Sequence, residues 1–103
     1  MKDTSEIYMD FKRARQAAEE LEEVAEDLHK ISGAQLPYIM EQLSASWKCP
    51  GAEAFQGKEE RLRTLIIKSE ASVRSAAAQI RRDAQRLYEA DLRAFEIAST
   101  RIR

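Results

Sequence analysis

Two long stretches of helical apolar pattern, separated by one short segment of turn residues, constrain the fold of this chain more than any other feature. In the first stretch, apolar residues recur in steps of three and four, the spacing that aligns side chains along one side of an α-helix. This row consists of Ile7, Phe11, Ala14, Ala18, Leu21, Ala25 and Leu28, widened by Val24 and Ile31. With only three glycines and two prolines in 103 residues, little interrupts the pattern. We therefore expect long helices.

A second row continues at the same spacing to the C-terminus. It consists of Leu62, Leu65, Ser69, Val73, Ala76, Ile80, Ala84, Leu87, Asp91, Ala94 and Ala98. Two helices joined by a short bend predict an all-α fold, an antiparallel two-helix hairpin forming a single domain over residues 1–103. The first helix is expected at about 5–46, the turn at about 47–51 and the second helix at about 52–102. Asp3 or Thr4 is the expected N-cap.

Around Gly33 and Pro37 the apolar pattern slips before it resumes at Met40 and Leu43. Proline has no backbone N–H and removes a hydrogen bond from the interior of a helix. The sequence therefore predicts a kink or a short break here, and one long bent helix is favoured over two stacked helices.

Charge is distributed unevenly, although the net charge is −1. The N-terminal half carries 6 Lys/Arg and 10 Asp/Glu (6 − 10 = −4), whereas the other half carries 11 and 8 (11 − 8 = +3). Halves of opposite charge that fold back on one another attract along their length, which supports the register more than the stability. In the expected register, residues 19–27 lie opposite about 74–82. The small net charge gives no general basic field for nucleic acid or anionic membrane.

The apolar stripe on each helix is wider than one partner helix can cover. We therefore expect the hairpin to dimerise into a four-helix bundle. The dimer core is expected to contain Leu21, Leu28, Leu65, Val73 and Ile80. A homodimer is favoured because the charges of the two halves are complementary. A paralogous hairpin, or the helical N-terminal region of an effector, is the alternative partner.

Residues that carry catalytic chemistry are sparse, and we expect neither an enzyme nor a cofactor or metal site. His29 is the only histidine and Cys49 the only cysteine, and no ligands lie at metal spacing around them. Paired carboxylates at 19–20 and 22–23 indicate a solvated helix face. A small basic ridge at Arg81, Arg82 and Arg86 could contact nucleic acid, although the acidic residues among them favour ion pairing.

Targeting signals of the common kinds are also missing from the sequence. The sequence contains no stretch of 18 apolar residues, the length that would predict a membrane-spanning helix. The first residues lack the basic-then-apolar pattern of a cleaved signal peptide. We therefore expect that any export would use a route without such a signal.

The bend places aromatic residues where turns usually recruit small polar ones. Trp47 and Phe55 either staple the end of the hairpin by packing on Leu43 and Leu62, or form a docking surface for a partner. The sequence leaves both interpretations open.

These features resemble the WxG family of small ESAT-like proteins, which type VII secretion systems export. The resemblance covers the whole chain: its length, two helices, and a central Trp and Gly followed by a small residue and Phe. The matching residues are Trp47, Gly51, Ala54 and Phe55. The family has one residue between Trp and Gly, whereas three intervene here, so the turn motif is divergent.

The family also carries a C-terminal export signal, and Leu87, Asp91, Ala94 and Ala98 match its spacing of apolar and acidic residues. Its common Tyr-x-x-x-acidic form is not matched, because Leu92 stands four residues after Tyr88. The same residues could equally be ordinary heptad core.

The resemblance implies a non-enzymatic protein that is cytoplasmic before export and then secreted. It would be exported itself, or act as export partner for a larger LXG-type effector, and would contact the secretion ATPase. The alternatives are an intracellular coiled-coil adaptor or scaffold and, more weakly, a nucleic-acid-binding protein.

Overall fold

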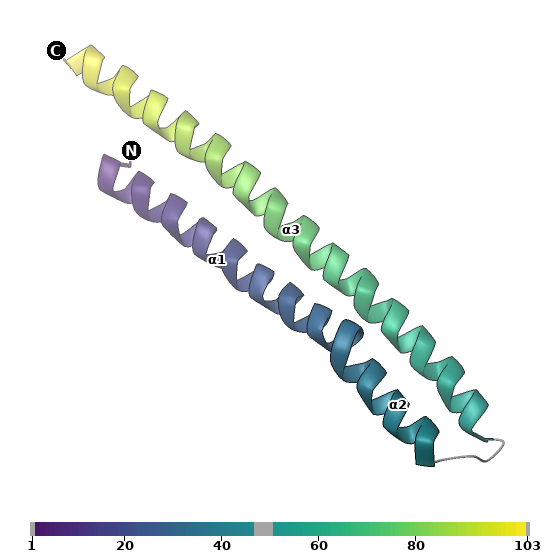
Figure 1. The fold of residues 1–103 in the computed structure, drawn as a ribbon. Helices are drawn as coiled ribbons and strands as arrows, with labels where there is room; N and C mark the ends of the chain where they lie inside the picture. Colours follow the sequence, from purple (N-terminus) through teal and green to yellow (C-terminus); the bar gives the residue numbers. More distant parts are fainter. Residues whose placement is uncertain (1, 47–50, 103) are drawn as a thin grey trace. The chain divides into compact units, whose positions relative to one another are not determined.

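The computed structural model describes residues 2–46 and 51–102. These residues form helices and no strands: α1 spans Thr4–Lys30, η1 spans Ile31–Gln35, α2 spans Leu36–Ser46 and α3 spans Gly51–Ile102 (Figure 1). The chain is an all-α helical hairpin, as the sequence predicts, and the observed helix bounds differ from the predicted ones by one residue at most. Two compact units make up the chain, Met1–Leu21 with Ser75–Arg103, and Glu22–Arg74. The single-domain assignment stays a prediction.

Asp3 caps the start of α1. Its Oδ1 accepts a hydrogen bond from the backbone N–H of Glu6 at 2.8 Å, and its carbonyl oxygen accepts one from the N–H of Ile7 at 3.0 Å. An N-cap carboxylate satisfies N–H groups that have no partner inside the helix. Of the two predicted N-caps, the structure selects Asp3.

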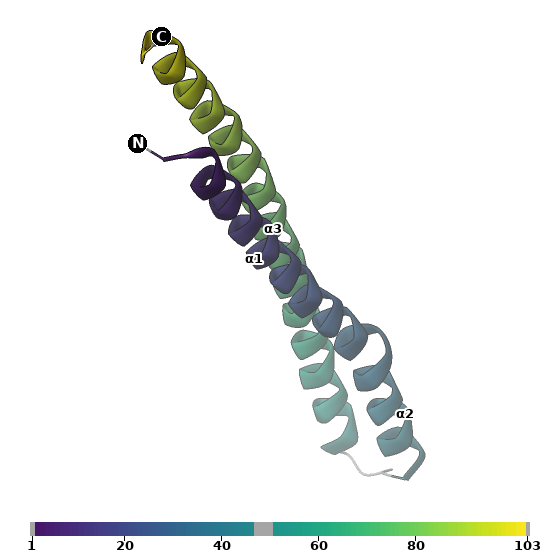
Figure 2. The ribbon, with the colours of Figure 1, turned by 90° about the vertical axis from the view of Figure 1, so that its left-hand side faces the viewer.

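In the first unit, the N-terminal part of α1 and the C-terminal part of α3 lie side by side (Figures 1 and 2). The predicted row on α1 is correct: Ile7 and Ala18 are buried, and Phe11 and Ala14 between them are half-buried. The ring of Phe11 meets Tyr88 of α3, with 4.5 Å between the ring centroids. Alanines fill most of the remaining seam, which brings the two backbones close together.

The predicted row on α3 is partly wrong, because the buried row is shifted by one residue at several positions. Ala77 is fully buried and Ala76 is exposed; Tyr88 is half-buried and Leu87 is exposed. Leu62, Leu65, Ser69 and Ala94 are also exposed, while Val73, Ile80, Ala84, Asp91 and Ala98 are buried or half-buried as predicted. On a helix this rich in alanine, two neighbouring rows fit the apolar pattern, and the packing uses the one that contains Ala77 and Tyr88.

In the second unit, η1 is a single π-helical turn, and the backbone N–H of Leu36 donates to the carbonyl of Ile31. A π-turn holds one residue more than an α-turn. Because of the extra residue, the seam continues after Ser32 at Leu36, Met40 and Leu43, which are all half-buried. The predicted interruption before Pro37 is therefore a π-turn, and the chain stays helical without a gap from Thr4 to Ser46.

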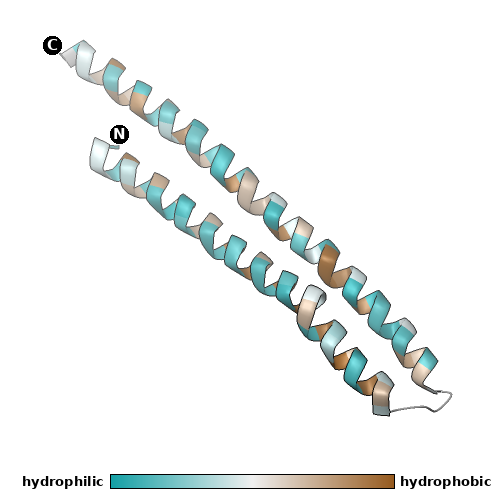
Figure 3. Cartoon of the chain, in the orientation of Figure 1, coloured by the Kyte–Doolittle hydropathy of each residue, from teal (hydrophilic) through white to brown (hydrophobic). Residues whose placement is uncertain are grey.

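The second unit also fixes the pairing of α1 and α2 with α3. Arg74 Nη2 lies 3.4 Å from Glu26 Oε2, and Gln56 Nε2 donates to Ser44 Oγ at 3.0 Å. The contact between Glu26 and Arg74 confirms the predicted register of 19–27 opposite about 74–82. Figure 3 shows hydrophobic positions gathered on α2 and near the middle of α3.

Candidate functional site

The turn motif is described in part. Gly51 begins α3, and Ala54 and Phe55 are exposed on its first turns. Trp47 lies outside the described residues, so the choice between staple and docking surface stays open. The motif residues that are described therefore lie on one helix end, with Phe55 40% exposed.

The four residues of the predicted export signal lie along α3 in the first unit. Leu87 is 64% exposed and Ala94 is exposed, whereas Asp91 and Ala98 are half-buried. The seam uses Tyr88 at this level, and the largely exposed Leu87 lines a small hollow at its edge, together with Ile7 and Asp91. Of the two interpretations of this segment, ordinary heptad core does not account for Leu87.

Asp91 has an ionic neighbour that sequence reasoning missed. Lys2 Nζ lies 3.6 Å from Asp91 Oδ2 and 2.7 Å from Asp10 Oδ2. The hydrogen bond and charge of Asp10, followed by the charge of Asp91, raise the pKa of Lys2, and the hydrogen bond from Lys2 lowers the pKa of Asp10. Lys2 is distant in sequence from Asp91, so only the antiparallel pairing of the helices brings the two together. Asp91 therefore lies beside the ammonium group of Lys2.

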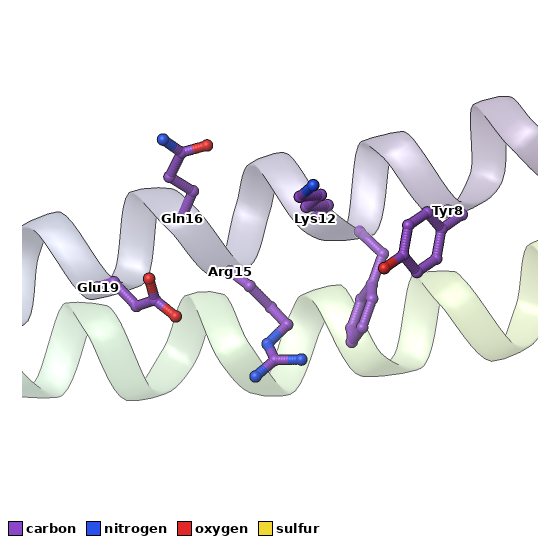
Figure 4. A pocket seen from close by; sticks show the side chains of 6 residues that line it. Tyr8, Lys12, Arg15, Gln16 and Glu19 are labelled. Carbon is purple, nitrogen blue, oxygen red and sulfur yellow. The ribbon is translucent and has the colours of Figure 1, made fainter.

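An open hollow of about 570 Å³ lies along α1 in the same unit. Its lining consists of Tyr8, Phe11, Lys12, Arg15, Gln16 and Glu19. Arg15 and Gln16 point away from each other (Figure 4), and the guanidinium carbon of Arg15 lies 5.7 Å from the centroid of the Phe11 ring. The polar groups diverge, so the hollow offers no convergent set that could hold a small molecule.

A charged cluster on the second unit joins the two helices. Glu70 accepts a hydrogen bond from Arg74 Nε at 2.8 Å and lies 3.2 Å from His29 Nδ1, and Arg74 also contacts Glu26. The hydrogen bond from Arg74, followed by that from His29, lowers the pKa of Glu70. The side chain of His29 is 62% exposed. Glu70 was missed, because the predicted row placed Ser69 at the seam instead.

The predicted basic ridge forms local pairs on α3. Arg86 pairs with Asp83, and Arg82 Nη2 donates to Gln79 Oε1 at 2.7 Å. The pairing of Arg86 lowers the pKa of Asp83. Ion pairing within the helix thus engages part of the ridge, as the sequence favours. Within residues 2–46 and 51–102, no group of three or more His, Cys, Asp or Glu side chains could hold a metal ion.

The five residues of the predicted dimer core do not share one environment. Leu21, Leu28, Val73 and Ile80 are half-buried, and Leu65 is 61% exposed.

In the described part of the chain, no helix has a stretch long and apolar enough to cross a membrane. Comparison of the chain with protein-family models, curated proteins and solved structures finds no match.

Proposed function

We propose that this chain is a non-enzymatic protein-interaction module that a type VII secretion system exports, alone or as export partner of a larger LXG-type effector. The observation that carries this proposal is the exposure of Leu87 beside Asp91 on α3. A largely exposed leucine, one helical turn from a carboxylate, is available to a receptor such as the secretion ATPase. The resemblance of the turn residues to the WxG family supports the same function.

The composition of the seam supports pairing with a second helical hairpin, either another copy or a paralogue. Among the described residues, the almost fully buried hydrophobic side chains are four alanines and one large residue, Ile7, which is 2% exposed. In contrast, eleven large hydrophobic side chains are exposed. Small domains bury a low fraction of their surface and depend on further contacts for stability. A second hairpin would supply those contacts.

Two carboxylates that share one lysine provide a matched test of the export signal. Asp91→Ala removes the acidic residue of the signal and a 3.6 Å contact with Lys2. Asp10→Ala removes the shorter contact of 2.7 Å with the same Lys2 but leaves the signal intact. Secretion is measured from a strain that carries type VII machinery, with helicity and dimerisation measured on the purified variants.

The expected result is that Asp91→Ala is not exported while Asp10→Ala is exported normally, with both variants folded. Normal export of both would contradict the signal. Trp47→Ala tests the turn motif: loss of export with unchanged melting temperature supports recognition, whereas a lower melting temperature with normal export supports the staple. An intracellular adaptor, the alternative function, predicts that the unmodified chain stays inside the cell.

A further inference from the structure

The helix pair of the first unit has two flanks, and the residues of the proposed export signal lie on one of them. Lys2 contacts both Asp10 and Asp91 there, and the exposed Leu87 lines the same small hollow. The hydrogen bond and charge of Lys2, followed by the charge of Arg13, lower the pKa of Asp10. Arg13 therefore belongs to this side as well, which we call the Asp91 flank.

The opposite flank begins with a row of exposed side chains on α1. Tyr8, Lys12 and Arg15 follow one another at steps of four and three residues, and Figure 4 shows them along one stretch of the helix. Successive residues of an α-helix are about 100° apart, which places these three about 80–140° around α1 from Ile7, on the side away from Asp10. Tyr8 is 55% exposed. Two positive charges and an aromatic ring thus share one side of α1.

Arginines of α3 continue this flank. The two helices are antiparallel and the rings of Phe11 and Tyr88 are 4.5 Å apart, so residues just after Phe11 lie beside residues just before Tyr88. Arg81 and Arg82 are one to two turns before Tyr88, at about 80° and 180° around α3 from Asp91. Both line an open hollow of about 590 Å³, together with Gln79, Gln85 and Arg86.

Positive charge therefore gathers on this side of the first unit. In the part of the chain that the structure describes, Lys12 and Arg15 form no ion pair, and Arg82 donates a hydrogen bond to a neutral amide oxygen at 2.7 Å. Acidic residues border this surface, Glu19 on α1 and Glu89 on α3. The net charge of −1 for the whole chain conceals this local excess. We call the surface the cationic flank; it consists of Tyr8, Lys12, Arg15, Arg81 and Arg82.

We infer that the cationic flank binds single-stranded nucleic acid, with its four cations on phosphate groups and the ring of Tyr8 stacked on a base. Three of the four cations are arginines, whose planar guanidinium groups bind phosphate oxygens through two hydrogen bonds at once. An exposed aromatic ring beside cations is the stacking platform of proteins that bind single strands. The polar side chains diverge, which suits a flexible polymer that contacts them one after another.

Other anionic partners fit the cationic flank less well. An anionic membrane would require a broad apolar face beside the cations, whereas Tyr8 is the one large exposed apolar side chain among the five residues of the flank. An acidic peptide would use the cations but leave the ring of Tyr8 without a role. Binding of nucleic acid goes beyond the proposed export function and uses neither Leu87 nor Asp91, so each stands or fails without the other.

Fluorescence anisotropy with a labelled oligothymidylate of about twelve nucleotides tests the inference on the purified full chain. Binding is expected at low salt and should weaken as salt rises. The logarithm of the association constant should fall against the logarithm of salt concentration with a slope of about −3, the value for four phosphate contacts on a single strand. The absence of binding at about 50 mM salt would overturn the inference.

Two double variants that remove the same charge from the same two helices test the site. Lys12→Gln with Arg82→Gln should weaken binding by about tenfold or more and reduce the slope to about −1.5. The control is Arg13→Gln with Arg101→Gln: Arg13 is on the Asp91 flank, and Arg101 is about 30 Å along α3 from Arg82. The control should weaken binding by less than about threefold. Equal losses would mean that general charge attracts the strand and would overturn the site. Circular dichroism of both variants checks that they are folded.

The ring of Tyr8 and two competitors test the chemical class of the ligand. Tyr8→Ala should weaken binding by about fivefold or more and Tyr8→Phe by less than about twofold, because stacking needs the ring and not the hydroxyl. Tyr38→Ala removes an exposed tyrosine of the second unit, 62% exposed, and should have no effect. Equal affinity for a duplex of the same length would contradict stacking on an unpaired base. Equal competition by polyglutamate of matched charge would identify the partner as an acidic peptide and overturn the assignment to nucleic acid.

Discussion

We expect that the spacing of the buried row is the reason for the π-turn. If so, a chain that lacks the extra residue, and whose row is back in step, should be as stable as before. After Ser32 the buried row continues at Leu36, Met40 and Leu43, one residue later than a heptad would place it. Deleting Ala34, which is exposed, would bring this row back into step with an ordinary α-helix. Proline at position 37 would then disfavour the α-helix by about 3 kcal/mol, so the deletion is made in a Pro37→Ala background.

The expected free energy of unfolding of Pro37→Ala with Ala34 deleted is within about 1 kcal/mol of Pro37→Ala alone, because no buried group is lost. The control deletes Ala17 in the same background, which puts the row on either side of it out of step. Either the part of the row before Ala17, which contains Ile7 (2% exposed), or the part after it would then turn out of the seam. Exposing one fully buried isoleucine costs about 1.5–3 kcal/mol, and the half-buried Phe11 adds to that loss.

Urea unfolding followed by circular dichroism at one fixed protein concentration measures these differences. A loss of 2 to 3 kcal/mol corresponds to a lower melting temperature by about 10 °C or more for a chain of about this size. Equal losses for the two deletions would refute the argument that the register of the seam causes the π-turn. Retention of stability by the Ala17 deletion would refute the assigned seam on α1.

Three further predictions concern the cap, the seam and the charged cluster. Asp3→Ala should lower the free energy of unfolding by about 1 kcal/mol in urea titrations, because the N–H of Glu6 loses its acceptor. Ile7→Ala should cost about 2–5 kcal/mol in the same assay, whereas Leu87→Ala should cost less than about 0.5 kcal/mol; equal costs would contradict the assigned seam. Glu70 has a lowered pKa, so its contribution is present above the unfolded-state value near 4.5 and is lost as the pH falls through the lower folded value. Melting temperatures should therefore fall on acidification, and less steeply in Glu70→Gln; identical pH profiles would contradict this contribution.

The features that the sequence predicts well are those that one helix sets by itself. The row from Ile7 to Leu28 has a large or small apolar residue at every third or fourth position and charged neighbours, so only one side of the helix can be buried. The register follows from two helices that fold back about one short turn, the uneven charge of the two halves matches it, and the Glu26–Arg74 contact agrees with it. Helix periodicity is sufficient for the row, and the position of the turn is sufficient for the register.

The features that the sequence did not predict depend on choices between nearly equal packings. Around Ala76 and Ala77, either alanine could face α1, and the pairing of Phe11 with Tyr88 favours the row that contains Ala77. The π-turn needed two pieces of information at once: the proline that cannot donate and the later phase of Leu36. The contact of Lys2 with Asp91 joins residues from opposite ends of the chain, which no local pattern reveals.

The alanine-rich seam has a consequence for the candidate interaction surfaces. Alanine at Ala18, Ala25, Ala77 and Ala84 allows close approach of two backbones but removes little apolar area from water. The large side chains that would add most to stability, such as Leu65 and Leu87, are instead exposed. A sequence that places small residues inside a helix pair and large apolar ones on its outside leaves hydrophobic surface available to the proposed partners. The exposed leucines are therefore where substitutions should separate folding from binding: Leu65 in the proposed pairing and Leu87 in the proposed export.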